Sequence, residues 1–413
     1  MKRKPLLIGL CLLSTFSACK KSTPVPQDTG KDLVLTAVEQ QKVGADNAFA
    51  LKLFKTISAG NTDNSNLFFS PLSVSFALAM ADNGANGQTL TDINNVMNFN
   101  GFTQDQVNSY YNKLITELPQ LDPNTTLKIA NSIWYQQNFT VLPQFSQTNT
   151  NYYKAKVQSA DFSSSATKDM INAWVSGQTN GKIPTIVDQI PSNVIMYLIN
   201  AIYFKSTWNE KFNVADTRQR SFYLANGSTV QTDFMSASIH LKVCNDSQTA
   251  VVELPYSNSK YSMVIAMPIN GNSLQSLSSN LDSVKWQTWM SKLSSIKGDI
   301  ILPKFKFSYS RLLNNDLISL GMGSAFSDAA DFTRINADGG GVNIDRVTHK
   351  AFIEVNEDGT EAAAVTSVSI GVTTAAPVYI PIDHPFLFAI REMKSGLILF
   401  TGIINNPLST GSN

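Results

Sequence analysis

The chain has 413 residues, of which 43% are hydrophobic and 15% charged, enough apolar material for a substantial core in one large or two smaller domains. The formal net charge is +1, and without Lys2, Arg3 and Lys4 near the N-terminus 29 basic residues stand against 31 acidic ones. A charge this close to zero argues against a surface built to bind nucleic acid or anionic membranes.

Residues 1–18 have the layout of an export signal peptide, with a basic start and a short apolar run over residues 6–13. This run is too short to span a bilayer comfortably. Ordinary signal peptidase prefers a small residue at the position of Phe16, whereas one large and two small residues before Cys19 are typical of a bacterial lipobox. We therefore expect an exported protein, held in the bacterial cell envelope (periplasmic or surface-exposed) by a lipid on Cys19.

A polar stretch over residues 20–32, with Pro24 and Pro26, follows and is expected to be a tether without structure. The expected boundaries are a lipidated tether over residues 19–40 and a single domain over 41–413. Cys11 leaves with the signal and Cys19 carries the lipid, so that Cys244 is the remaining thiol. The domain is then expected to lack an internal disulfide in spite of its exported context. We expect Cys244 to be a small packed residue and not a nucleophile.

Helical patterns dominate the first part of the chain. Apolar residues over 33–57 recur at helical spacing. Ser70 followed by Pro71 predicts the start of a second helix, because proline is tolerated in the first turn. Further helices are expected near 103–117 and 166–177.

Strand patterns take over later in the chain, most clearly in the strict alternation over 304–309. The other strand candidates are apolar or β-branched runs at 128–135, 194–204, 251–254, 263–267, 386–390 and 397–400. Helices early and strands late, without an internal repeat, indicate an α+β fold in one folded unit.

The segment 357–365 is the most informative of the chain. It consists of Glu357, Asp358, Gly359, Thr360, Glu361, Ala362, Ala363, Ala364 and Val365. Alanine favours helix, but the Thr, Val and Ile residues that follow favour strands, so that this is a loop able to become a strand. In a strand, Thr360, Ala362, Ala364 and Thr366 would share one face, and each is small enough to pass beneath covering structure.

Short motifs along the chain resemble those of the serpin family, in the same order and at similar spacing, over about residues 45–407. They are 68–74 (FFSPLSV), 200–208 (NAIYFKSTW), 253–256 (ELPY), 302–305 (LPKF), 348–351 (THKA) and 383–388 (DHPFLF). Each motif is weak by itself, whereas the ordered set is highly specific.

The resemblance implies a serpin fold, with a large mixed sheet, smaller sheets, surrounding helices and an exposed reactive loop at about 357–382. It also implies inhibition of serine proteases. The protease cuts the loop and forms an acyl-enzyme, the freed loop enters the sheet as a strand, and the attached protease is deformed before it can deacylate. The native fold is then held by kinetics, and a monomer without cofactor or metal is expected.

By the same resemblance, Ser70, Ser73, Asn200 and His349 match a polar cluster at the point where the sheet must part, which we call the shutter. Trp208 matches a tryptophan beneath the start of insertion. A single buried histidine is ordinarily a satisfied core residue, and for His349 this role and a role in sheet opening coincide.

Family spacing counted forward from Glu357 places the residue before the cut at Thr373. Spacing counted back from the C-terminal motif places it at Thr374, and Val372 stays open. All three are small or β-branched, and no Lys or Arg lies in the loop to anchor a trypsin-like enzyme. Elastase-like or subtilisin-like serine proteases are therefore the expected partners, and Tyr379 lies too far along to trap a chymotrypsin-like enzyme.

Two rival functions remain at this point. A hydrolase would need a base among His240, His349 and His384, but no nucleophile elbow or metal-binding histidine pair accompanies them. A serpin-fold protein that binds without inhibiting is the stronger rival. The small inward residues of the hinge favour inhibition over it. The glycines at 339–341 fit neither a phosphate loop nor a calcium loop, and a tight turn is expected there.

Overall fold

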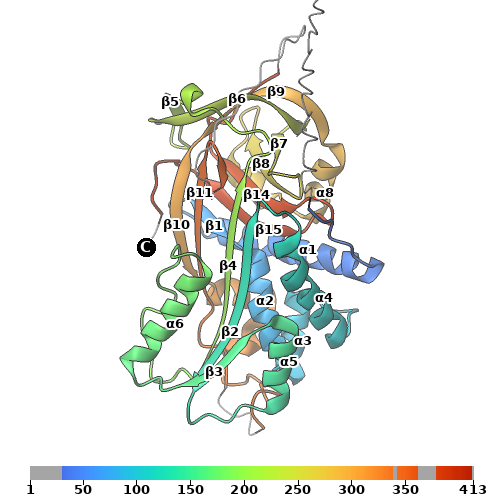
Figure 1. Ribbon diagram of the computed structural model, residues 1–413, viewed down its shortest axis with the longest axis vertical. Helices are drawn as coiled ribbons and strands as arrows, with labels where there is room; N and C mark the ends of the chain where they lie inside the picture. Colours follow the sequence, from blue (N-terminus) through green and yellow to red (C-terminus); the bar gives the residue numbers. More distant parts are fainter. Residues whose placement is uncertain (1–29, 338–341, 361–377, 412–413) are drawn as a thin grey trace, which may run out of the picture.

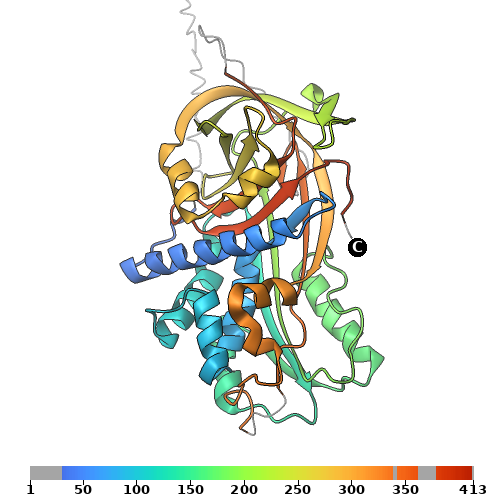
Figure 2. The ribbon, with the colours of Figure 1, turned by 180° about the vertical axis from the view of Figure 1, so that it is seen from behind.

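The computed structural model describes residues 30–337, 342–360 and 378–411. It confirms the α+β class: a tall six-stranded sheet forms the front, helices pack below and behind it, and a second sheet builds the upper part (Figure 1). Seen from behind, α1 crosses the molecule between the upper sheet and the lower helices (Figure 2).

The helices of the described chain include all four that the sequence predicts. They are α1 (Ala37–Ala59), α2 (Pro71–Asp82), α3 (Gly87–Val96), α4 (Gln104–Glu117), α5 (Pro143–Tyr153), α6 (Ser165–Gln178), α7 (Leu274–Ser279), α8 (Ser283–Lys292) and α9 (Asn314–Leu317), with short 3₁₀ or π turns at Leu118–Gln120, Val214–Asp216, Ile318–Met322 and Gly323–Phe326. Thr36 and Thr103 start α1 and α4 with complete capping boxes, which satisfy backbone N–H groups that have no partner inside the helix.

The six-stranded sheet contains the segment that the sequence singles out. In spatial order it consists of β10 (Phe305–Leu312), β11 (Thr348–Asn356), β12 (Gly359–Thr360), β4 (Met196–Thr207), β2 (Thr126–Gln136) and β3 (Lys156–Ala160). β2 and β3 run parallel and the other pairs are antiparallel, so that the sheet is mixed.

The second sheet has nine strands within the described chain. In spatial order they are β1 (Leu67–Phe69), β15 (Ile398–Ile404), β14 (Phe386–Glu392), β8 (Tyr261–Pro268), β7 (Thr249–Pro255), β6 (Thr229–Asn245), β9 (Ser294–Pro303) and β13 (Val378–Pro381), with β5 (Arg218–Tyr223) paired to β6. The two sheets share one aromatic core. Phe68 stacks on Phe388 and Phe400 at 5.8 and 5.4 Å and meets Phe307 of β10 edge-on at 6.4 Å.

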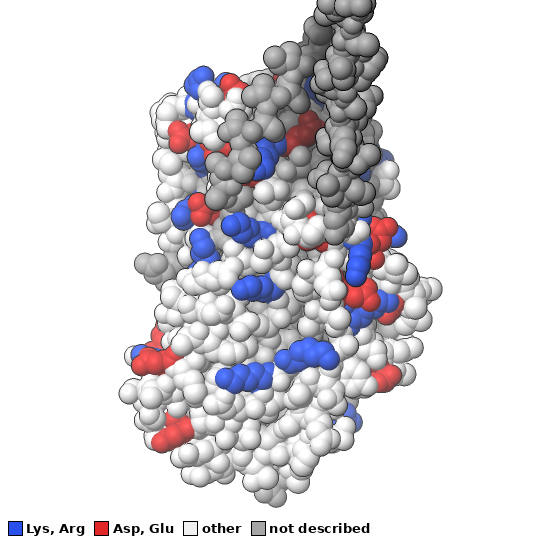
Figure 3. All heavy atoms as spheres, viewed as in Figure 1, with Lys and Arg blue, Asp and Glu red and all other residues white. Residues whose placement is uncertain are grey.

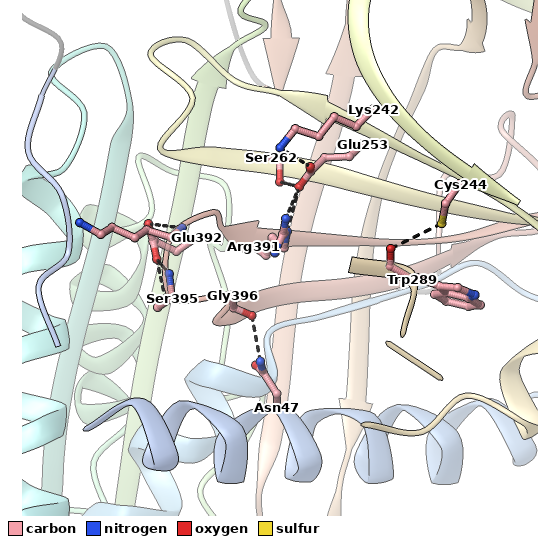
Figure 4. Close-up of polar contacts among 11 residues, drawn as sticks. Asn47, Lys242, Cys244, Glu253, Ser262, Trp289, Arg391, Glu392, Ser395 and Gly396 are labelled. Atoms are coloured by element: carbon pink, nitrogen blue, oxygen red, sulfur yellow. Dashed lines mark hydrogen bonds and ion pairs between the residues drawn. The ribbon is translucent and has the colours of Figure 1, made fainter. Parts of the chain in front are cut away.

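A buried ion pair joins strands of the upper sheet (Figure 4). Arg391 of β14 donates to Glu253 of β7 from Nε at 2.9 Å, and the Ser262 hydroxyl donates to the same carboxylate at 2.7 Å. A buried charge without a partner costs free energy, so an arrangement that separated Arg391 from Glu253 would be destabilised. The ion pair therefore favours the observed placement of β14 and β7 on either side of β8. In the same region Cys244 is buried, and its thiol contacts the carbonyl of Trp289 at 3.5 Å. Burial raises the pKa of Cys244, which suits a packed thiol and not a nucleophile.

The packed chain begins earlier than the expected boundary at residue 41. Leu33 is buried, and the carboxylate of Asp32 pairs with Lys260 at 2.8 Å and Lys394 at 2.9 Å. Residues 30–40 are therefore part of the folded domain, which begins before the expected boundary at residue 41. Residues 1–29, with the expected signal and Cys19, lie outside the described residues.

Candidate functional site

The two-residue strand β12 divides the six-stranded sheet at its upper end. Gly359 and Thr360 pair with Asn356 and Val355 of β11 on one side and with Thr207 and Ser206 of β4 on the other. Over the described residues, β11 and β4 are joined through β12 and form no ladder of their own. We call the space between these strands below Thr360 the slot.

Gly359 is required where β12 enters the sheet. Its φ is +151°, and a Cβ there would lie 2.1 Å from the carbonyl oxygen of Ser206 and 2.6 Å from the Cα of Thr207. A side chain would therefore collide with the backbone of β4, and only glycine allows this approach.

Trp208 and Tyr256 hold β12 from below. The Trp208 indole N–H donates to the carbonyl of Asn356 at 2.9 Å, and its backbone N–H donates to that of Asp358 at 2.7 Å. Its ring stacks on Tyr256 with the centroids 4.6 Å apart, and the Tyr256 hydroxyl lies 2.6 Å from that of Thr360. Trp208 thus lies beside the hinge. Tyr256 also contacts the hinge, a role that the sequence does not predict although Tyr256 belongs to the motif at 253–256.

Two acidic residues anchor the start of the hinge. Glu357 accepts a hydrogen bond from Thr217 at 2.7 Å and pairs with Lys304 at 3.0 Å, while Asp358 pairs with Lys211 at 3.0 Å. Burial raises the pKa of Glu357, but the hydrogen bond from Thr217 and the charge of Lys304 outweigh it, so that this pKa lies below its usual value. Glu357 is therefore charged at neutral pH.

Three of the four expected shutter residues come together around Ser70. Its hydroxyl accepts from the backbone N–H of Ser73 at 3.0 Å, which caps α2, and donates to the carbonyl of Leu399 at 2.6 Å. Its backbone N–H donates to Nε2 of His349 at 3.1 Å, and burial lowers the pKa of His349 to about 4. The imidazole is thus neutral, with its proton on Nδ1.

Asn200 lies on β4 and contacts a different partner. Its Nδ2 donates to Oδ1 of Asn131 on β2 at 2.7 Å, and Asn131 in turn donates to the carbonyl of Tyr153 at 2.7 Å. The Oδ1 of Asn200 is buried and has no hydrogen-bond partner among the described residues. Asn131 is thus a fifth polar residue of this region that the sequence does not single out, and Asn200 keeps an unused acceptor.

Two small pockets lie along the slot beneath a covering segment. One lies just below Thr360 and is lined by Ile202 and Phe204 of β4 and Ala351 of β11. The segment 179–190, which follows α6, contributes to its wall and to that of a second pocket lower down, beside Leu198.

Ion pairs tie this covering segment to β11 across the slot. Lys182 lies 3.9 Å from Glu354 and 4.6 Å from the ring centre of Phe352, and Asp188 pairs with Lys350 at 3.2 Å. These partners are partly exposed, so that each contact contributes little and breaks readily. The covering segment thus lies over the slot and is only weakly tied to β11.

The remaining expected site residues lie outside the described residues: Glu361, Ala362, Ala363, Ala364, Val365, Val372, Thr373, Thr374 and Cys19. Two of the three histidines lie on the surface beside carboxylates, His240 at 2.7 Å from Glu210 and His384 at 2.6 Å from Asp383. Neither makes a hydrogen bond to a hydroxyl or thiol within the described chain.

Charge and membrane features complete the description. Figure 3 shows Lys and Arg side chains scattered over the middle of the sheet face, without a continuous basic patch on that face. Across the three described ranges, no helix is both long and apolar enough to cross a membrane. The same residues contain no group of three His, Cys, Asp or Glu side chains placed to hold a metal ion.

Comparison with known proteins places the chain beside one family. The family model described as Serpin (serine protease inhibitor) matches residues 44–407. Iripin-2 of Ixodes ricinus is 34% identical over 376 residues, which cover 89% of this chain and 94% of the relative. Human leukocyte elastase inhibitor is 34% identical over 385 residues, with coverage of 89% and 100%.

Solved structures agree in fold. The thermophilic serpin tengpin in its native state superimposes with a TM-score of 0.82 at 32% identity, covering 91% of this chain and 96% of that one. Human thyroxine-binding globulin gives a TM-score of 0.82 at 29% identity, covering 90% and 100%.

Proposed function

Because the chain belongs to the serpin family, we propose that it inhibits serine endopeptidases as a suicide substrate. A protease of small or aliphatic primary specificity attacks the reactive loop, and the cleaved loop enters the slot before the acyl-enzyme is hydrolysed. The observation that carries this proposal is β12, which already lies between β11 and β4 and is hydrogen-bonded to both.

The register of β12 predicts where each later residue of the loop would lie if the loop continued as a strand in the slot. Thr360 is opposite Ser206 and Val355, so continuation in the same register brings Ala362 opposite Phe204 and Ile353. By the same rule Ala364 comes opposite Ile202 and Ala351. These alanines would enter the pocket below Thr360, which suits side chains of their size.

Continued further, this register brings Thr366 opposite Asn200 and His349. Its hydroxyl would then lie beside the unused Oδ1 of Asn200 and supply the donor that this buried acceptor lacks. Insertion would thus satisfy a polar group that the starting form leaves unpaired, which contributes to the driving force.

The chemistry of the trap belongs to the protease. Its serine oxygen bonds to the carbonyl carbon of the loop residue, the peptide bond breaks, and the new amine stays on the part of the chain that continues into β13. Insertion of the 12 residues from Glu361 to Val372 would carry the acylated protease about 40 Å along the sheet. We propose that this displacement disturbs the oxyanion hole, and that the inhibitor supplies no catalytic group.

The bait residues support the class of target. Val372, Thr373 and Thr374 are small or β-branched, which suits the primary pocket of elastase-like and subtilisin-like enzymes. The similar human leukocyte elastase inhibitor is named for a protease of this class. Neighbouring small side chains differ by only about 1–3 kcal/mol in such pockets, so that a class of proteases is proposed and no single enzyme.

A binding protein without inhibitory activity is the second candidate. The likeness to thyroxine-binding globulin favours it, because that fold neighbour is named for a bound ligand. In this case the loop would be cut without a stable complex with the protease.

We also propose that the protein is exported and anchored by a lipid on Cys19, from the pattern of residues 1–19. Fractionation of cells that express the parent and Cys19→Ala tests this: the parent should sediment with membranes and the variant should not.

A matched pair of hinge variants tests the inhibitory proposal. In the register above, Ala362 faces the core and Ala363 faces outward, so that arginine at the first position buries an unpaired charge and arginine at the second does not. Pancreatic elastase, neutrophil elastase and subtilisin are incubated with each protein, and detergent-stable complexes are counted on denaturing gels. We expect complexes for the parent and Ala363→Arg, and cleavage alone for Ala362→Arg.

Cleavage without complex for the parent at every enzyme ratio would contradict inhibition and favour the binding protein. Equal trapping by Ala362→Arg and the parent would contradict strand insertion. Thr360→Arg is a poorer test than Ala362→Arg, because Thr360 is already buried against Tyr256 in the starting form.

A further inference from the structure

Strands β5, β6 and β9 of the nine-stranded sheet lie at the upper end of the molecule (Figure 1), and an exposed groove runs over them. It crosses β5, β6, β9 and β13 and is lined by Arg218, Arg220, Ser238, Asp299, Ile301 and Tyr379, among others. Acidic and basic side chains lie next to one another over β5 and β6 on this end (Figure 3). Tyr379 belongs to the C-terminal end of the expected reactive loop at about 357–382, and the inhibitory cycle proposed above assigns no role to the other residues of the groove.

The groove exposes the residue types that dominate protein interfaces. Tyr379 is 58% exposed and its neighbour Val378 is 53% exposed, although both belong to a strand. Arg220 pairs with Thr232 through its backbone, but its side chain makes no ion pair or hydrogen bond among the described residues. The Arg218 guanidinium donates to the carbonyls of Ala215 and Thr217 and has no carboxylate partner there. Tyrosine and arginine are enriched among the residues that carry binding energy at interfaces.

The position of β13 relates the groove to the reactive loop. β13 is the first described segment after the loop and pairs with β9, with Tyr379 opposite Asp299. The candidate bonds at residues 372–374 precede Val378 by four to six residues, which span at most about 20 Å. The body of a protease that attacks there must therefore approach this end of the molecule.

We propose that the groove is a second contact surface for the target protease. It would contact the protease next to the part of the protease's active-site cleft that binds the loop residues after the cut. The occupant is a serine protease with an acidic side chain on that rim, opposite Arg218 and Arg220, and with apolar surface for Tyr379. Asp216 and Asp299 also face the groove and leave its charge balanced, so that the arginines act as local contacts and not as a broad basic field. This inference rests on the proposed inhibitory function.

Charge reversal at Arg220 tests the inference. The association rate constant of the trapped protease is measured for the parent, Arg220→Glu and Tyr379→Ala, at low and high salt. Lys168→Glu on α6, at the opposite end of the molecule, is the control with the same change of net charge. We expect a roughly tenfold or larger loss for Arg220→Glu at low salt that shrinks at high salt, a salt-independent loss for Tyr379→Ala, and no change for Lys168→Glu.

The number of inhibitor molecules used per trapped protease should stay constant, because the groove acts before cleavage. If the parent traps no protease, the proposed function fails. If the parent traps protease and Arg220→Glu associates at the parent rate, the second contact surface is wrong. The inference would also be overturned if Arg220→Glu associated with the protease at the parent rate but was no longer retained on heparin-agarose. Arg220 would then bind a polyanion and not the protease.

Discussion

The residues on both sides of Gly359 are held by buried polar contacts. The carboxylates of Glu357 and Asp358 are buried and pair with partly exposed lysines, Lys304 and Lys211. Thr360 is also buried, and its hydroxyl lies against that of Tyr256, next to the stacked ring of Trp208. We infer that Thr360 stays in place as a pivot while the chain after it moves.

His349 gives a prediction at the level of one side chain. Its pKa is lowered by burial to about 4, whereas an unfolded chain gives about 6.5. Between these values the unfolded form binds a proton that the folded form does not, so that His349 destabilises the fold as pH falls from 6.5 to 4. The full effect is on the order of 3 kcal/mol, and it is absent above pH 6.5.

The measurement is the urea midpoint of the parent and His349→Gln at pH 7.5 and pH 5. Glutamine can accept the bond from the Ser70 N–H and does not titrate. Burial raises the pKa of Asp82 to about 6, which has the opposite pH dependence and is common to both proteins. We expect the parent to lose more stability than the variant at pH 5, and parallel losses would contradict a buried neutral His349.

At the level of elements, the helices that could be predicted from the sequence begin with a side-chain N-cap. The caps at Ser70 and Thr103 are readable because hydroxyl residues precede helical spacing. α5 is missed because its Asn- and Thr-rich sequence has low helix propensity. Packing of Tyr153 and an internal bond from Asn149 to the carbonyl of Phe145 compensate for it.

β6 is missed for a related reason. This long strand contains Asp233, Ser236 and Ser238, which have low strand propensity, and it pairs with β5, β7 and β9 along different parts of its length. No single alternating pattern describes a strand whose neighbours change. The contacts of Tyr256 and Asn131 could not be predicted from the sequence either, because they depend on which strands become neighbours in the sheets.

The segment before α1 gives a prediction about the domain boundary. Leu33 is buried, whereas the side chain of its neighbour Val34 is 66% exposed. Comparing a serine substitution at each position therefore distinguishes the effect of losing a buried side chain from that of changing the local sequence. Leu33→Ser should lower the urea midpoint by an amount equivalent to about 2 kcal/mol, and Val34→Ser should leave it unchanged. Equal midpoints for all three proteins would place residue 33 outside the cooperative fold.

At the level of the whole molecule, the starting form leaves favourable interactions unmade. The edges of β4 and β11 face a slot with small pockets, and the Asn200 carbonyl lacks a donor. The covering segment 179–190 and its ties to β11 stand in the way of closure. We propose that this fold is held by a barrier and that cleavage of the loop releases it.

The central claim is that the cleaved loop becomes a strand between β4 and β11. The most direct test is the thermal unfolding of the protein after elastase has cut the loop, with the cut placed at residues 372–374 by mass spectrometry of the released fragment. A marked rise in the unfolding temperature relative to intact protein is predicted, because the new strand pairs with both edges and fills the slot. An unchanged unfolding temperature after complete cleavage would contradict insertion.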